Sequence, residues 1–371
     1  MTTLLCITLF GEICGSSRIR VLQFIPYLEK NGITCVSKRL FSDNYFRIIA
    51  NQKRCNRVVK SGYSILSGVV MLLKKIKYAL IAYKYDVILI QKDAFQGILQ
   101  KILYRMNKNI IFEFDDTIFE PSQFARGFNK SYDKYRRKSL PSFLKICKHI
   151  IAENSYLAEY TLRYNKNVSI ITAPIDVEEF FPKRKNRGKI VILGWIGSAF
   201  TTNQLRLLVP ALEKISQKYP HVILKLIGAD DTITFQNIRI QQVSWSLNTM
   251  IEELQSFDIG LMPLDEDLFN KGRLGYKMIQ YMSMGIPIVA SNTGLNPEVV
   301  IENENGFLAS NEQEWIDKLS LLIENPKLRK KLGENGRKKA VEKYSLRTAE
   351  QKFLRIITKV VQKELSTKEI G

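Results

Sequence analysis

The chain has few histidines, no paired cysteines and no long uninterrupted apolar run. Its two histidines exclude a multi-histidine metal site, and its five cysteines are widely spread with no Cys-x-x-Cys pair. This pattern excludes a zinc knuckle and a disulfide framework, and it fits a reducing compartment. The most apolar stretch, residues 64–83, contains three lysines. Each would cost roughly 2.5–3.5 kcal/mol at a bilayer centre, so we expect no membrane span.

Acidic residues are also scarce relative to basic ones. The chain has 56 Lys and Arg against 36 Asp and Glu, a net charge of +20, and its first 112 residues hold 18 basic and 5 acidic residues. Such an excess indicates either a solvated surface or attraction to an anionic surface. We expect a cytoplasmic protein that contacts the inner face of an anionic cell membrane through the basic residues around the apolar stretch: Lys53, Arg54, Arg57, Lys60, Lys74, Lys75 and Lys77.

A nucleic acid is not an expected partner, because no zinc finger, RNP-like motif or aromatic-rich basic strand accompanies the charge.

Length and patterning favour two α/β domains. A chain of 371 residues is longer than one hydrophobic core usually supports. Short apolar runs alternate with helical patterns, which is typical of doubly wound parallel sheets. A segment rich in Pro, Lys and Arg at 174–188 predicts the boundary. We expect an N-terminal domain at 1–178, a C-terminal domain at 179–345 and a final helix at 346–371. The expected strands are 3–10, 33–40, 87–91, 110–114, 149–152, 168–172, 189–196, 222–228, 238–243, 259–262, 286–290 and 306–308. Helices are expected between them, among others at 18–31, 202–218, 273–284, 312–323 and 327–343.

A strand–turn–helix passage at residues 194–203 predicts a phosphate site. Gly197 would let the backbone approach a ligand, Ser198 and Thr202 carry hydroxyl groups, and the free amides of a helix start favour an anion. An ordinary strand–turn–helix connection with Thr201 or Thr202 as the helix cap is the alternative.

Three cations surround a second predicted helix start. Lys271, Arg273 and Lys277 stand beside Gly272 and Gly275. Arg273 and Lys277 are four residues apart and are expected on one helix face. The composition predicts an anion site, with a solvated helix surface as the alternative.

Two further motifs follow strands of the first half. Asp115 and Asp116 follow the strand at 110–114, where ligands of open α/β sheets bind. Adjacent carboxylates at such a place can bind sugar hydroxyls, take part in acid–base chemistry or hold a metal, and loop capping by Asp116 is the alternative.

The first strand is followed by a turn containing Gly11, Ser16, Ser17 and Arg18. Its glycine spacing departs from the dinucleotide motif, so neither a nicotinamide nor a flavin cofactor is expected.

The chain as a whole resembles the retaining glycosyltransferases of family 4. The resemblance is carried by residues 257–264 (FDIGLMPL), 275–282 (GYKMIQYM), 285–291 (GIPIVAS) and 294–300 (GLNPEVV), and by the earlier motifs in the same order. It implies a GT-B fold, in which two Rossmann-like doubly wound domains face each other across a cleft. It also implies that the nucleotide sugar binds mainly to the second domain and the acceptor mainly to the first. Neither a metal nor another cofactor is implied.

The resemblance assigns roles to the motif residues. It implies catalytic roles for Asp115, Asp116, Arg273 and Lys277. It places the donor nucleotide at Gly197, Ser198, Thr202, Lys271, Gln280 and Glu298, and the acceptor or donor sugar at Gly11, Ser16, Ser17 and Arg18.

The chain departs from the family pattern at several of these positions. Gly272 and Gln280 replace the two glutamates of the family's Glu-x7-Glu, and Asp115 aligns with its usual histidine. The usual Arg and Lys after the second-domain turn are not evident in residues 197–203, so we expect Arg273 and Lys277 to replace them.

The implied activity is transfer of a sugar, with retention, from a UDP- or GDP-type donor to a glycan or lipid-linked acceptor. Such acceptors include growing surface polysaccharides such as lipopolysaccharide or capsule. Two alternatives remain open at this stage. One is a glycosyltransferase-like nucleotide-binding subunit without catalysis, and the other is a sugar-nucleotide epimerase of the same fold.

Overall fold

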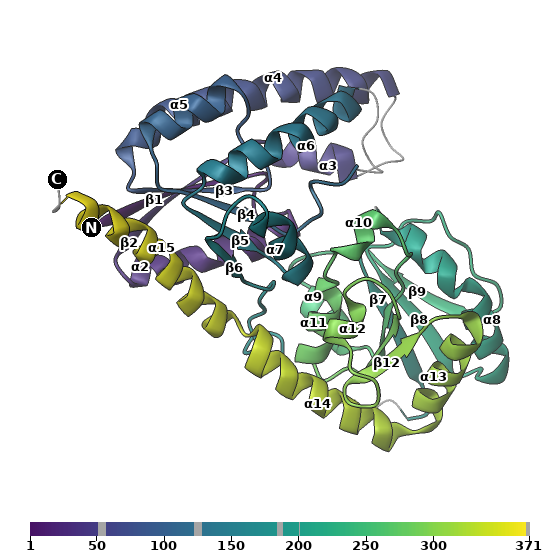
Figure 1. The fold of residues 1–371 in the computed structure, drawn as a ribbon. Coiled ribbons are helices and arrows are strands. Elements are labelled where there is room, and N and C mark those ends of the chain that lie inside the picture. The colour runs from purple at the N-terminus through teal and green to yellow at the C-terminus, as the bar shows by residue number, and fades with distance from the viewer. Residues whose placement is uncertain (51–56, 122–127, 184–187, 200, 369–371) are drawn as a thin grey trace. The chain divides into compact units, whose positions relative to one another are not determined.

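The computed structural model describes residues 1–50, 57–121, 128–183, 188–199 and 201–368 (Figure 1). It divides into two compact units. The first comprises Met1–Pro174 with Arg347–Gly371, and the second comprises Ile175–Leu346. Each unit is built on one six-stranded sheet in which all neighbouring strands are parallel. The expected α/β fold with two Rossmann-like units is confirmed.

The sheet of the first unit has the order β2-β1-β3-β4-β5-β6. The strand order reverses between β1 and β3, and ligands of doubly wound sheets bind at such a switch point. The strands are β1 (Thr2–Thr8), β2 (Ile33–Arg39), β3 (Val87–Gln91), β4 (Ile110–Phe114), β5 (His149–Ala152) and β6 (Val168–Ile170). Strands β3, β4 and β5 are buried at every residue, as expected for a parallel sheet covered on both faces.

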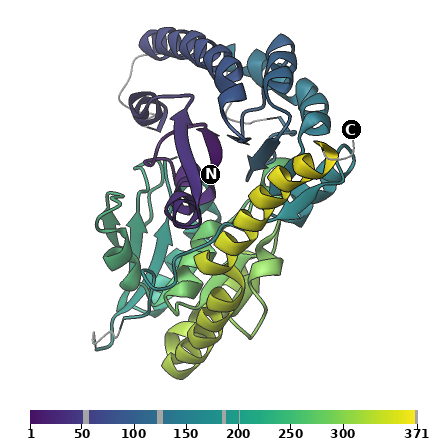
Figure 2. The ribbon, with the colours of Figure 1, turned by 90° about the vertical axis from the view of Figure 1, so that its left-hand side faces the viewer.

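Helices of the first unit cover both faces of this sheet. α4, α5 and α6 pack together over one face around Phe95, Phe112 and Phe143 (Figure 1). α15 lies beside η1, where Phe353 stacks on Phe24 with ring centroids 4.5 Å apart. Figure 2 shows α15 as the long yellow helix that leads to the C-terminus. The helices are α1 (Gly15–Arg20), η1 (Leu22–Phe24), α2 (Ile25–Lys30), α3 (Asp43–Ala50), α4 (Arg57–Ile81), η2 (Ala82–Lys84), α5 (Ile98–Met106), α6 (Phe128–Ile146), α7 (Ser155–Leu162) and α15 (Leu346–Lys368).

The sheet of the second unit has the order β12-β11-β10-β7-β8-β9, which is the Rossmann order. Its switch point lies between β7 and β10. The strands are β7 (Val191–Ile196), β8 (Val222–Ile227), β9 (Arg239–Val243), β10 (Ile259–Met262), β11 (Ile288–Ser291) and β12 (Gly306–Ala309).

Helices of the second unit enclose its sheet. α8 and α13 pack together in a core that includes Leu212 and Leu319, and α11 packs against α14. The helices are η3 (Thr202–Leu208), α8 (Val209–Lys218), α9 (Met250–Gln255), α10 (Leu268–Lys271), α11 (Tyr276–Ser283), α12 (Asn296–Val299), α13 (Glu312–Glu324) and α14 (Pro326–Tyr344).

The strands were easier to predict than the helices. Every expected strand is present, and four have the expected bounds, at β3, β4, β5 and β10. The single helix expected at residues 18–31 is wrong, because the chain breaks at Val21 and α2 restarts with Pro26 in its first turn. The helix expected at 202–218 is likewise divided into η3 and α8, and Pro210 opens α8.

Among the described residues, no helix is both long enough and apolar enough to cross a bilayer.

Candidate functional sites

The switch point of the first unit brings Ser16 and Asp115 together. Ser16 follows β1 and Asp115 follows β4, and the Ser16 hydroxyl donates to Asp115 Oδ2 at 2.7 Å. The side-chain amide of Gln91, the last residue of β3, donates to Ser16 Oγ at 3.2 Å. Two of the motifs found in the sequence therefore form one polar cluster at the carboxyl edge of this sheet.

Lys92 completes this cluster, and the sequence analysis missed it. Its ammonium group lies 2.8 Å from Asp115 Oδ1 and 2.5 Å from Asp116 Oδ2. Burial alone would lower the pKa of Lys92, but the charges of Asp115 and Asp116 outweigh it and raise the pKa above its usual value. The available signal was a charged residue directly after a predicted buried strand.

Ser17 does not face a ligand, contrary to expectation. Its side chain is fully buried, its hydroxyl donates to Gln91 Oε1 at 2.9 Å, and it accepts the N–H of Phe10 at 3.2 Å. Both hydrogen-bonding directions of the hydroxyl are used, so Ser17 holds β1 to β3. A Cβ on Gly11 would meet only side-chain ends, Asp43 Oδ1 at 2.6 Å and Arg39 Nη1 at 2.8 Å, so packing does not require glycine there. The guanidinium of Arg18 donates to the Glu12 carbonyl at 2.6 Å.

A buried charged layer lies next to Asp115. Arg20 Nε donates to Glu113 Oε1 at 2.7 Å, and Arg20 Nη1 lies 4.0 Å from Glu153 Oε1. All three side chains are buried. Burial raises the pKa of Glu113 to about 7 and the pKa of Glu153 well above its usual range, although Arg20 opposes both shifts. One guanidinium is therefore shared by two carboxyl groups whose charged forms are disfavoured.

The Gly197 turn of the second unit lies at the carboxyl end of β7. A Cβ on Gly197 would meet the Trp195 ring at 2.2 Å and Thr201 Oγ1 at 2.6 Å, so the backbone there has room only for glycine. The expectation of free amides is wrong for two positions. The Gly197 N–H donates to the Ile227 carbonyl at 3.0 Å, because the β7–β8 ladder continues into the turn. The Ser198 N–H donates to Thr201 Oγ1 at 3.1 Å.

Thr202 is likewise a structural residue in this turn. Its hydroxyl donates to the Ser198 carbonyl at 3.2 Å and accepts the Asp230 N–H at 3.1 Å, and the residue is almost fully buried. The helix that follows is the 3-10 helix η3 instead of the expected α-helix start. Ser198 is exposed, and Phe200 lies outside the described residues.

Lys277 lies against the same tryptophan that packs on Gly197. Its Nζ lies 4.4 Å from the centroid of the Trp195 ring. Burial, with a smaller contribution from the charge of Arg273, lowers the pKa of Lys277 to about 7. Two motifs that are 80 residues apart in sequence are therefore joined at the switch point of this sheet.

Arg273 is not on a helix face with Lys277, contrary to expectation. α11 begins at Tyr276, after Gly275 at its N-cap, and the Arg273 N–H donates to the Asn270 carbonyl at 3.1 Å in the preceding turn. Glycine disfavours helical backbone, so the helix starts one turn later than the charge pattern suggested. The charge of Arg273 still acts on Lys277 across this turn.

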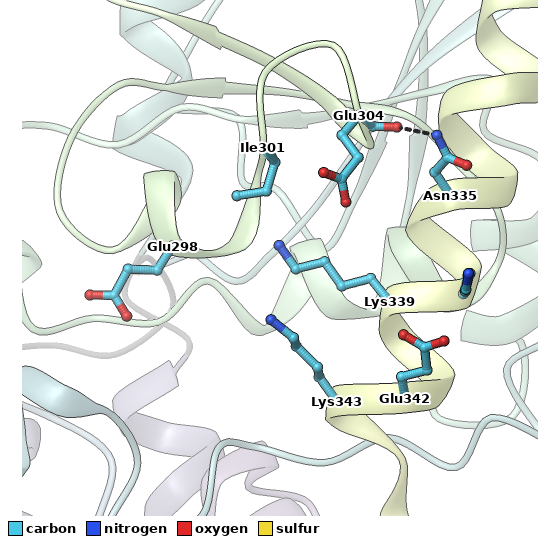
Figure 3. A pocket seen from close by; sticks show the side chains of 8 residues that line it. Glu298, Ile301, Glu304, Asn335, Lys339, Glu342 and Lys343 are labelled. Carbon is cyan, nitrogen blue, oxygen red and sulfur yellow. Dashed lines mark hydrogen bonds between the residues drawn. The ribbon is translucent and has the colours of Figure 1, made fainter.

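The remaining donor-side residues are less closely grouped. Gln280 is buried on α11, and its amide donates to the sulfur of Met250 at 3.6 Å, a weak acceptor. Lys271 is exposed at the end of α10. Glu298 lines a pocket of about 530 Å³ beside α14, where it lies with Lys339 and Lys343 instead of with the Gly197 turn (Figure 3).

Within the described ranges, no group of three or more His, Cys, Asp or Glu side chains has an arrangement that could hold a metal ion.

Comparisons with known proteins point to glycosyltransferases. Residues 176–339 match the profile of the family "Glycosyl transferases group 1". This match covers most of the second unit. The chain is 26% identical over 275 residues to the uncharacterized glycosyltransferase MJ1178 of Methanocaldococcus jannaschii, covering 66% of this chain and 76% of that protein. It is 21% identical over 267 residues to spore coat protein SA of Bacillus subtilis, covering 62% and 70%. The match and the MJ1178 likeness support a glycosyltransferase.

Solved glycosyltransferase structures share the fold of this chain. The crystal structure of Anabaena Alr3699/HepE in complex with UDP and glucose superimposes with a TM-score of 0.66 at 15% identity, covering 97% of this chain and all of that one. At this identity the likeness shows the fold, which is GT-B.

Proposed function

We propose that the protein is a retaining glycosyltransferase that moves a sugar from a nucleotide-diphosphate sugar to a surface polysaccharide or lipid-linked glycan. One observation carries the donor half of the proposal. Lys277, a lysine whose pKa is lowered to about 7 by burial and by Arg273, lies over Trp195 at the switch point of the unit that matches the group 1 glycosyltransferases. Buried titratable groups with strongly shifted pKa values concentrate at functional sites.

The chemistry assigned to these residues is charge stabilisation of the leaving group. As the glycosidic bond of the donor breaks, the departing diphosphate gains negative charge, and fixed cations oppose that charge most strongly in a desolvated site. Lys277 is suited to act as a point charge, and Arg273 to contact phosphate oxygens in a bidentate way. The Gly197 and Ser198 amides donate within the protein. Lys277 and Arg273 therefore provide a larger part of the charge stabilisation than the sequence alone suggested.

A uridine nucleotide is the first donor to test. Alr3699/HepE, which shares the fold, has been crystallised with UDP, with UDP-glucose, and with UDP and glucose. The retaining outcome, by front-face displacement at the anomeric carbon, is carried by the family resemblance. The acceptor is placed at the first unit, near Asp115 and Ser16.

A thermal-shift screen with UDP, GDP and their sugars tests the donor. A nucleotide at 100 times its dissociation constant stabilises by about 2.7 kcal/mol, which raises Tm measurably. We expect one diphosphate, and its sugar, to raise Tm while the free nucleoside does not. Product analysis by NMR with the binding sugar nucleotide then reads the anomeric configuration. Binding without turnover would favour a non-catalytic subunit, and C2 epimerisation of the sugar would favour an epimerase.

Peripheral membrane contact is a second part of the proposal, and α4 supports it. One face of this helix leaves a row of large apolar side chains exposed: Ile65, Leu66, Val69, Val70, Leu72, Leu73 and Leu80. Lys77 and Lys84 are exposed nearby. Lys75 is not part of this surface, since it is buried and paired with Asp93 at 3.0 Å. Lys74 donates to the Leu40 carbonyl at 2.9 Å. The side chains of Lys53, Arg54, Arg57 and Lys60 lie outside the described part of the chain.

We expect the protein to co-sediment with vesicles containing anionic lipid, and salt to weaken the binding, because each basic residue near an anionic leaflet contributes about 1 kcal/mol. The double variant Leu66→Gln with Leu73→Gln should release the protein with its Tm unchanged, since both side chains are about 60% exposed. Leu321→Gln, on an exposed position of α13, is the matched control. No co-sedimentation of the wild type with anionic vesicles would contradict the membrane contact.

A further inference from the structure

We propose that Lys92 is a positioning residue that fixes the carboxylates of Asp115 and Asp116, so that this sheet edge recognises the hydroxyl groups of an uncharged sugar. The inference rests on the proposed function, in which Asp115 lies at the transferred sugar or its acceptor. It assigns a role to a residue outside the motifs of the sequence.

The place of Lys92 in the fold is the first argument. It follows β3 directly, at the switch point of the first sheet, between the turn after β1 and the end of β4. Its backbone has φ +60°, in the left-handed region that favours glycine. The Asp93 N–H donates to the Gln91 carbonyl at 2.7 Å, which closes a strained three-residue turn around Lys92.

The strain indicates a function for the Lys92 side chain. The turn is held by the sheet, because the Lys92 N–H donates to the Glu113 carbonyl at 2.8 Å. Glycine would adopt this backbone without strain, so the backbone alone does not explain a lysine here. Backbone strain of this kind collects at functional sites, where the surrounding structure maintains it.

The contacts of the ammonium group are the second argument. The Lys92 side chain is 14% exposed and that of Asp115 is 13% exposed, so their attraction is screened less than that of a surface pair. The ammonium has three N–H donors and bridges two adjacent carboxylates. Asp115 is thus held from two directions, by Lys92 on Oδ1 and by Ser16 on Oδ2.

The charge of the cluster points to the ligand chemistry. Lys92, Asp115 and Asp116 carry a net charge of about −1. The neighbouring Arg20 is shared by Glu113 and Glu153, whose charged forms burial disfavours. The Lys92 ammonium is already paired with two carboxylates, so this edge favours an uncharged ligand over a phosphate. Carboxylate oxygens accept hydrogen bonds from hydroxyl groups, and a serine hydroxyl can donate or accept. A sugar ring with several free hydroxyls fits that set of partners.

Two substitutions of Lys92 separate its charge from its backbone. Lys92→Gly removes the ammonium while suiting the turn, and Lys92→Arg keeps a positive charge. We expect Lys92→Gly to lower kcat by roughly 10²-fold, the scale of a displaced catalytic group, with the KM of the nucleotide sugar nearly unchanged. Ethylammonium added to Lys92→Gly should restore part of kcat, and Lys92→Arg should keep most of it. Lys101→Ala, an exposed lysine of α5, is the control for nonspecific effects of amine.

Two results would overturn the proposal. One is full turnover in Lys92→Gly. The other is a loss that neither ethylammonium nor Lys92→Arg repairs while the fold is intact, which would make Lys92 a purely structural residue.

An unfolding measurement keeps this test separate from the proposed function. Lys92→Gly, Asp115→Asn and the double variant form a cycle read by Tm alone, without substrate. If Lys92 fixes Asp115, the double variant should lose less Tm than the two single losses combined, by roughly 2–4 °C. Additive losses would contradict the positioning role even in an active enzyme. Coupling in a protein that transfers no sugar would instead contradict the proposed function alone.

Discussion

Lys277→Met should lower turnover by roughly 10²-fold or more, the effect of removing one charge-stabilising group from a transition state. The affinity for nucleoside diphosphate should fall as well, while binding of the free nucleoside stays nearly constant. The same substitution should raise Tm, because methionine fills the space over Trp195 without a buried charge. A loss of activity that accompanies a gain of stability is the pattern expected of a functional residue held in an unfavourable environment.

The pH dependence of both effects follows from the lowered pKa of Lys277. Its pKa is about 7 in the folded protein and near 10.5 in the unfolded chain. Between these values the unfolded chain binds more protons, so this group makes the folded state more stable as the pH rises. The gain in Tm from Lys277→Met should therefore be largest below pH 7. A bound diphosphate restores the ammonium, so the wild type should take up a proton on binding near pH 8, measurable by calorimetry in buffers of different ionisation enthalpy.

Arg273→Ala should reduce turnover and diphosphate affinity by a similar factor, since it supplies the second cation. Lys330→Met is the matched control for Lys277→Met, because it makes the same change at a highly exposed lysine of α14. If Lys277 and Arg273 can both be replaced with turnover and diphosphate affinity unchanged, the diphosphate assignment is wrong. Lys271, exposed at the end of α10, and Arg18 in the first unit would then be tested next.

The sheets of this protein are predictable from sequence, because a buried parallel strand is a short apolar run that reads the same wherever it occurs. β3, β4, β5 and β10 have the expected bounds for that reason. Helix starts are harder. The charge spacing of Arg273 and Lys277 is helical, but the backbone choice at Gly275 decides that α11 begins later.

The candidate sites were likewise predicted only in part. The sequence locates the carboxyl ends of strands, and so it placed Asp115 and Gly197 directly after strands, as the structure has them. The sequence does not reveal whether a polar side chain is already hydrogen-bonded to another part of the protein. Ser17 and Thr202 resemble ligand-binding hydroxyls in the sequence, yet Gln91 accepts from the Ser17 hydroxyl and the Asp230 N–H donates to that of Thr202. Such pairing joins residues from different strands and turns, so only the folded structure reveals it.

Lys92 is the opposite case, a residue of the candidate site that the sequence did not indicate. It stands in no motif, and its importance comes from a backbone conformation and from two carboxylates more than 20 residues away. Local sequence rules are expected to fail at functional sites, where strain and buried charge are maintained by the rest of the fold.

Asp115→Asn is expected to abolish most turnover while leaving the affinity for nucleoside diphosphate nearly unchanged. The asparagine has nearly the same shape, but it carries no charge to pair with Lys92 and offers one acceptor oxygen in place of two. A sugar hydroxyl at this position would lose its charged acceptor, and a charge-assisted hydrogen bond is about twice as strong as a neutral one. The measurements are steady-state kinetics with the donor found in the screen, and calorimetric binding of the diphosphate alone.

Glu159→Gln is the matched control for Asp115→Asn, because it makes the same change of a carboxylate to an amide on an exposed residue of α7. Turnover and Tm of this control should match the wild type. Unchanged turnover in Asp115→Asn would remove Asp115 from the site. Loss of turnover and of diphosphate affinity together, with a large fall in Tm, would indicate that the charge of Asp115 is needed to hold Lys92 and Ser16 in the fold. Only the separation of catalysis from nucleotide binding places Asp115 at the sugar.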